Sequence, residues 1–209
     1  MKLIWLVIYS SLVVSLYAGT DNDLYITKMD IFLSMDDYKK AHAQMEKIDL
    51  TLLSKDQKAG MFNKCGFIYY HLGRFAQARK NYEKALLLNP DLAHVYNNLG
   101  VLYFKIGEYE KAKAFYLRAL LKKAEYPRVM INLVIVNLYL KKFFESLKWL
   151  KKALECNENY VKKRYNREKA MNQLSELIRK NPDDKELETL LEWVKNSSDK
   201  DFTKAQNLY

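Results

Sequence analysis

A repeat of 34 residues constrains this chain more than any other feature of its sequence. The segments "GRFAQARKNYEKALLLNP" from Gly73, "GEYEKAKAFYLRALLKKA" from Gly107 and "KKFFESLKWLKKALECNE" from Lys141 align without a gap. Upstream, "FNKCGFIYYHLG" matches "YNNLGVLYFKIG", which pairs Gly66 with Gly100. Glycine costs about 0.5–1 kcal/mol relative to alanine inside a helix. A glycine that recurs within an apolar run of helical period therefore indicates a position where another element packs closely.

The period and its matched columns resemble the tetratricopeptide repeat, whose pattern is aromatic-x2-Leu-Gly-x2-Tyr, then Ala-x3-Phe/Tyr, then Pro. Residues 93–126 follow the pattern except that Ala124 replaces the proline, and 59–92 has Cys65 at the Leu column. Residues 127–160 follow it more loosely, with Met130, Val134 and Asn137 at the aromatic, glycine and tyrosine columns. A degenerate copy is predicted at 22–55. Gly73 and Gly107 are predicted turns between paired helices, with Lys141 in the same column.

The resemblance implies an all-α, tetratricopeptide-like helical-hairpin solenoid. Because a solenoid needs a polar-faced cap at its end, residues 161–209 are predicted to form C-terminal capping helices and a tail. Their apolar residues recur at helical spacing in "KAMNQLSELIRK" and "KELETLLEWVK".

The segment 1–18 has the pattern of a secretory signal peptide. One lysine precedes a stretch without charge from Leu3 to Thr20, and Ala18 is a small residue at the expected cleavage site. If uncleaved, residues 3–18 would serve as a membrane anchor. We therefore expect export, to the bacterial periplasm. Cys65 and Cys156 fall in repeats that the resemblance places two structural units apart, so both are expected to be buried free thiols.

The sequence shows no catalytic or metal-binding pattern. The three histidines, His42, His71 and His94, fall in different repeats without metal-ligand spacing, and phosphate-loop, nucleophile and dinucleotide motifs are missing. We expect a non-enzymatic protein that takes no cofactor, no metal and no small-molecule substrate.

In tetratricopeptide-like folds, function usually resides in a concave groove lined by the first helix of each pair. The register assigns this lining to Asn63, Phe67, Tyr70, His71, His94, Asn97, Asn98, Val101, Phe104, Lys105, Arg128, Ile131, Asn132, Ile135, Leu138 and Tyr139. Asn98 and Arg128 stand where two residues of the family's carboxylate clamp would, but Phe67 and Asn132 replace the Asn and Arg expected beside them. The apolar and aromatic lining favours an amphipathic helix or an extended apolar peptide. Alternatively, the helix at 161–180 or 185–196 fills the groove itself.

Charge suggests a second surface. The chain has a formal net charge of +10, and residues 141–169 hold ten Lys or Arg against four Glu. The candidate basic patch is Lys148, Lys151, Lys152, Lys162, Lys163, Arg164 and Arg167. Two functions of different class follow: an exported scaffold that binds a protein or peptide in the groove, and a module that holds anionic lipid or cell-wall polymer through residues 141–169. Nucleic acid is not expected, because export removes most of the opportunity for it.

Overall fold

A computed structural model describes residues 21–164 and, beyond them, 172, 175–176, 178–180, 182–183, 185, 188 and 191–192. The side chains of 162–164 are outside the description, as is the predicted signal peptide at 1–18. All regular structure in the described residues is helical. The chain divides into an N-terminal unit that ends at Pro90 and a C-terminal unit that begins at Asp91.

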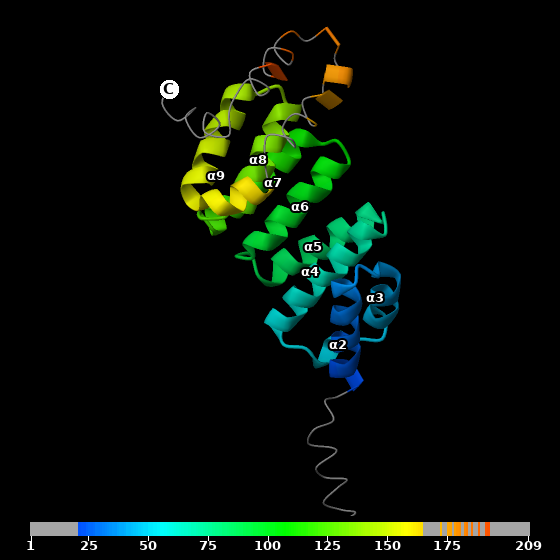
Figure 1. Ribbon diagram of the computed structural model, residues 1–209. Coiled ribbons are helices and arrows are strands. Elements are labelled where there is room, and N and C mark those ends of the chain that lie inside the picture. Colours follow the sequence, from blue (N-terminus) through cyan, green and yellow to red (C-terminus); the bar gives the residue numbers. More distant parts are fainter. Residues whose placement is uncertain are drawn as a thin grey trace, which may run out of the picture. The chain divides into compact units, whose positions relative to one another are not determined.

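In the N-terminal unit, α2 (Asp21–Ser34) pairs with α3 (Tyr38–Met45), and α4 (Lys55–His71) pairs with α5 (Phe75–Leu88) (Figure 1). A short 3₁₀ turn, Leu50–Leu52, precedes α4. Ser54 caps α4 reciprocally with Gln57, so this helix begins four residues before the predicted start of the repeat at 59. The core of the unit is formed by Met29, Ala41, Ile48, Met61, Cys65 and Ile68.

In the C-terminal unit, α6 (Ala93–Lys105) pairs with α7 (Tyr109–Lys122), and α8 (Pro127–Tyr139) pairs with α9 (Phe143–Arg164). The backbone of α9 is extended at Asn157, so a second helical piece starts there. The Asn157 side chain accepts a hydrogen bond from the Tyr160 amide at 2.8 Å, and Val161 is buried in the core. No described helix combines the length and the apolar character that a membrane crossing needs.

The turns between paired helices fall where the repeat predicted them. Gly73 and Gly107 have φ angles of 75° and 84°, in the left-handed region that glycine adopts without a steric penalty. Lys141 takes the same conformation at 57° in the third copy, although a left-handed residue with a Cβ costs about 1–2 kcal/mol.

The close-packing positions are confirmed. A Cβ on Gly66 would lie at 2.6–3.0 Å from three ring carbons of Tyr82, and one on Gly100 would lie within 3.0 Å of three ring carbons of Tyr116. Both tyrosines are buried. The two glycines therefore let the ring of the second helix lie directly on the backbone of the first.

The thiols differ from each other. Cys65 is buried, as predicted, and burial raises its pKa to about 12. Cys156 is only partly buried, because it lies near the solvent side of the α9 stripe that packs on α8. The prediction that both thiols are buried was therefore wrong for Cys156.

Candidate functional site

Four rings gather at the end of α4 in the N-terminal unit. Phe67, Tyr70 and His71 lie three and four residues apart, which places them on one side of the helix. Tyr38, the first residue of α3, stacks on His71 with ring centroids 4.0 Å apart, and Phe67 meets His71 edge-on at 4.4 Å. Phe67 remains 37% exposed. We call Tyr38, Phe67, Tyr70 and His71 the aromatic cluster.

One carboxylate borders the aromatic cluster. The Tyr38 hydroxyl donates a hydrogen bond to Oδ1 of Asp36 at 2.5 Å, and this bond raises the pKa of Tyr38 to about 12. Partial burial lowers the pKa of His71, opposed by the nearby Asp36 charge. At neutral pH the cluster therefore presents uncharged rings beside a single negative charge.

A related group of rings occurs in the C-terminal unit. Phe104 of α6 lies 5.3 Å from Tyr109 and 4.9 Å from Tyr139, and the two tyrosines lie 5.0 Å apart. Tyr109 begins α7 as Tyr38 begins α3. The groove assignment missed both residues, because it considered first helices alone. The recurring aromatic residue that opens the second helices, Phe75, Tyr109 and Phe143, was the signal that could have found them.

Two predicted polar residues of the C-terminal unit are engaged within the fold. Asn97 is 3% exposed and accepts a hydrogen bond from Nδ2 of Asn132 at 2.8 Å. Arg128 is exposed, and its Nε donates to the Tyr160 hydroxyl at 3.3 Å. The Asn97–Asn132 contact joins α6 to α8, and the Arg128 contact joins α8 to the piece that follows Asn157.

The α8 part of the predicted groove is largely covered. Ile131 and Leu138 are buried, in the core cluster that also includes Met130, Val134 and Leu150. Ile178 and Leu191, two described residues of the predicted capping region, pack against this cluster. Burial raises the pKa of Tyr139, and the carboxylate of Glu176 adds to the rise. C-terminal residues of the chain therefore lie at the α8 face.

The other predicted groove residues are more accessible. The half-buried ones are Asn63, Tyr70, Asn98, Val101, Phe104, Ile135 and Tyr139; the exposed ones are His71, His94, Lys105 and Arg128. Partial burial of its ring lowers the pKa of His94.

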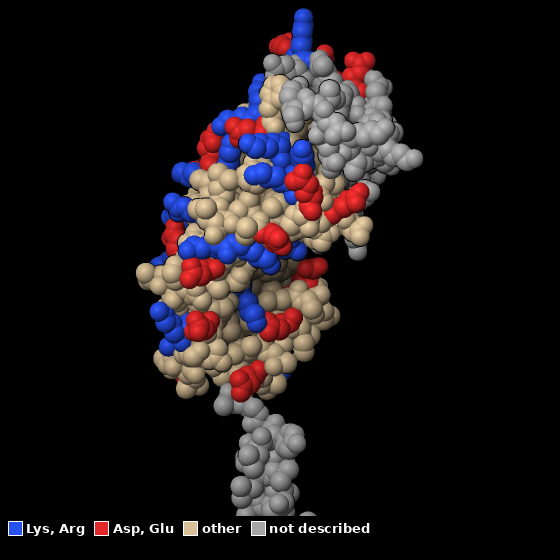
Figure 2. All heavy atoms as spheres, turned by 90° about the vertical axis from the view of Figure 1, so that its left-hand side faces the viewer, with Lys and Arg blue, Asp and Glu red and all other residues tan. Residues whose placement is uncertain are grey.

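Three members of the predicted basic patch are described: Lys148, Lys151 and Lys152, all exposed on α9. Lys152 holds its ammonium 4.8 Å from the centre of the Trp149 ring. Lys162, Lys163, Arg164 and Arg167 lie outside the described side chains. Basic side chains are spread widely over the side of the molecule shown in Figure 2, with acidic ones among them.

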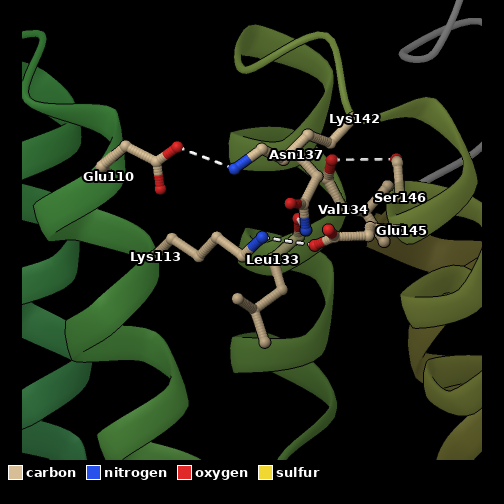
Figure 3. A network of polar contacts seen from close by, with 8 residues as sticks. All are labelled: Glu110, Lys113, Leu133, Val134, Asn137, Lys142, Glu145 and Ser146. Atoms are coloured by element: carbon tan, nitrogen blue, oxygen red, sulfur yellow. Dashed lines mark hydrogen bonds and ion pairs between the residues drawn. The ribbon is translucent and has the colours of Figure 1, made fainter.

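A polar network connects α7, α8 and α9 (Figure 3). Lys113 pairs with Glu145, and Lys142 pairs with Glu110 at 2.8 Å. The Ser146 hydroxyl donates to the Val134 carbonyl at 2.9 Å. Asn137, fully buried, donates through Nδ2 to the Leu133 carbonyl at 2.8 Å, while its Oδ1 has no partner. The two ion pairs and the Ser146 hydrogen bond join different helices. Nowhere in the described residues do three His, Cys, Asp or Glu gather as metal ligands.

Comparison with known proteins agrees with the helical hairpins. Residues 57–120 match the family described as tetratricopeptide repeat. Among solved structures, MamA is 20% identical, with 73% of this chain and 86% of that chain covered and a TM-score of 0.59. A tetratricopeptide repeat protein from Parabacteroides merdae is 20% identical, with 84% of this chain and 73% of that chain covered and a TM-score of 0.60.

A further similar structure is YrrB, described as a TPR protein with an unusual peptide-binding site. It is 16% identical, with 66% of this chain and 69% of that chain covered and a TM-score of 0.56. None of the curated proteins compared matches the chain. At these identities the structural matches show the fold alone. The described residues therefore adopt the all-α, helical-hairpin fold of tetratricopeptide solenoids, and residues 57–120 match the tetratricopeptide repeat family.

Proposed function

We propose that this chain is a non-enzymatic interaction scaffold that binds an apolar or amphipathic segment of a partner protein at the aromatic cluster of the N-terminal unit. The observation that carries the proposal is the 37% exposure of Phe67, in edge contact with the Tyr38–His71 stack. Aromatic side chains that combine rigid packing with an exposed edge are frequent energetic centres of protein interfaces.

The chemistry of the cluster suits a peptide. Its rings offer apolar surface, and Asp36 offers an acceptor that would orient a donor on the ligand. YrrB, which has the same fold, is described as having a peptide-binding site, so this fold can hold a peptide. That similarity supports the proposal by analogy only.

The second ring group, Phe104, Tyr109 and Tyr139, takes a lesser part in the proposal. Ile178 and Leu191 pack against the neighbouring α8 cluster, so a partner that used the α8 face would have to displace them. We therefore place the principal contact in the N-terminal unit, and expect substitutions at Phe104 and Tyr139 to have smaller effects than one at Phe67.

Export to a bacterial envelope is part of the same proposal and rests on the signal-like segment 1–18. Expression of the full chain in a bacterium, followed by N-terminal sequencing, tests it. A mature chain that begins at Gly19 is the expected result, and a chain that keeps Met1 in the cytoplasm would refute export.

The binding test compares two exposed apolar residues of the same unit. Peptides are selected from a random display library against the full chain, and their affinities are measured for Phe67→Ala and Leu87→Ala. Leu87 is 83% exposed and lies on α5, away from the aromatic cluster. We expect Phe67→Ala to weaken binding by about tenfold or more, the usual effect at an interface hot spot, and Leu87→Ala to change it less than about twofold. Equal losses in the two variants, or a selection that yields no binder, would overturn the proposal.

A further inference from the structure

We infer that the outer face of α7 and α9 binds the surface of an anionic lipid bilayer. This outer face consists of exposed residues on both helices: Lys111, Leu117, Arg118 and Leu121 on α7, and Phe144, Lys148, Lys151 and Lys152 on α9. It shares no residue with the aromatic cluster and belongs to the C-terminal unit, so it adds a second activity to the proposed scaffold.

Two ion pairs bridge these helices near their first turns. Glu110 and Lys113 of α7 pair with Lys142, just before α9, and with Glu145 of α9 (Figure 3). Because both pairs step forward by three residues, α7 and α9 run in the same direction and are bridged by side chains near their first turns. Leu117 and Lys148 follow these bridges on their respective helices.

Large apolar side chains stand out from this face. Phe144 is 74% exposed, Leu121 is 83% exposed and Leu117 is 36% exposed. Removal of such side chains from water is favourable. Basic residues separate them: Arg118 follows Leu117, and Lys148 lies one turn after Phe144. Apolar side chains interspersed with lysine and arginine are the pattern of surfaces that lie in the headgroup region of a membrane.

The charge of the face is complementary to an anionic lipid. Residues 108–123 and 141–152 hold ten Lys or Arg and three Glu, and all three glutamates are in ion pairs with lysines of these segments. Lys122 pairs with Asp91, which leaves six of the ten basic residues outside these four ion pairs. Two more glutamates, Glu155 and Glu158, follow toward the end of α9. Residues 21–90, by contrast, hold eleven basic and nine acidic residues. The excess of positive charge in the described residues therefore lies mainly on α7 and α9, the helices that also carry Leu117, Leu121 and Phe144.

The apolar side chains favour lipid over other polyanions. A nucleic acid or an acidic polymer would be attracted by the lysines, but it would gain little from burying Phe144 and Leu121. A bilayer gains from both kinds of residue, because its anionic headgroups attract the lysines and the apolar side chains insert below the headgroups.

The test is co-sedimentation of the full chain with anionic vesicles, in which phosphatidylcholine and phosphatidylglycerol are mixed about two to one, and with vesicles of phosphatidylcholine alone. The first variant carries Lys148→Gln, Lys151→Gln and Lys152→Gln. Its matched control carries Lys39→Gln, Lys55→Gln and Lys80→Gln, three exposed lysines of the N-terminal unit. We expect the affinity for anionic vesicles to fall by about 10- to 100-fold in the first variant and by less than about twofold in the control. Any membrane binding by residues 3–18 is the same in the two variants, so the ratio of their vesicle affinities reports the contribution of the outer face.

A second pair separates lipid insertion from attraction by charge alone. Phe144→Ser is expected to weaken vesicle binding by about 5- to 10-fold, and Leu87→Ser, its exposed apolar control, to leave it unchanged. Raising NaCl from about 0.05 M to 0.5 M should weaken binding of the wild type more than tenfold, since surface charges are screened. Equal losses of vesicle binding in the lysine variant and its control would overturn the proposal. Full vesicle binding by Phe144→Ser would also overturn it, because it would indicate a general site for polyanions. Phe67→Ala should bind vesicles as the wild type does. Failure of the lipid proposal can therefore be distinguished from failure of the proposed peptide site.

Discussion

Replacing Gly100 with alanine tests the packing that defines the repeat. Alanine is favoured over glycine within a helix by up to about 1 kcal/mol, so local propensity alone predicts a more stable protein. The structure predicts the opposite, because the new methyl group would lie within 3.0 Å of three carbons of the Tyr116 ring. That ring is 2% exposed and cannot swing into solvent. Overpacking of this kind costs about 1–3 kcal/mol. The net expectation is a loss of about 0–2 kcal/mol.

Gly60 provides a matched control. It also lies inside a helix, but a Cβ built there meets no atom within 4 Å. Gly60→Ala should therefore raise the free energy of unfolding by about 0.5–1 kcal/mol. The two substitutions are chemically identical, so the difference between them, about 1–3 kcal/mol, isolates the contact with the tyrosine.

Urea unfolding followed by circular dichroism at 222 nm measures both variants, and thermal midpoints should shift by about 2–4 °C per kcal/mol. A double-mutant cycle with Tyr116→Leu adds a direct check, because removal of the ring should make Gly100→Ala favourable. If Gly100→Ala stabilises the protein as much as Gly60→Ala does, the close-packing explanation of the glycine column is wrong.

Three further predictions concern the polar groups of the fold. Asn137→Leu should raise the free energy of unfolding by about 1–2 kcal/mol in urea titrations, because it removes a buried carbonyl oxygen that has no hydrogen-bond partner. A lower free energy of unfolding would show that this oxygen does have a partner. Glu110→Lys should lower the thermal midpoint slightly, and adding Lys142→Glu should restore it; additive losses of stability in the double variant would argue against the ion pair. Burial lowers the pKa values of His71 and His94, so the unfolded chain takes up protons first and the free energy of unfolding should fall as pH drops through about 6.5. Thermal melts at pH 7.5 and 5.5 should show a smaller loss of stability for the double variant His71→Gln/His94→Gln than for the wild type. An equal loss in both would contradict the lowered histidine pKa values.

The candidate site was predictable only in part. The helical register correctly placed Phe67 and His71 on one face, because residues three and four apart share a side of a helix. It did not include Tyr38, which reaches His71 from a different helix. It also placed Asn97, Ile131 and Leu138 in an accessible lining, and the structure buries all three. Burial depends on what covers a face, and the register of one helix carries no information about its neighbours.

What the sequence determined by itself is the paired helices of the described repeats, the turns within these pairs and the points of closest approach. These follow from local properties: the helical period of apolar residues, the left-handed turn at Gly73 and Gly107, and the missing side chain at Gly66 and Gly100. The tertiary structure decided which surfaces remain open. The stack of Tyr38 on His71, the packing of Ile178 and Leu191 near α8, and the exposure of Phe144 and Leu121 all depend on contacts between residues distant in the chain. Such contacts are set by how helices pack against one another, and that is where the candidate functions of this protein lie.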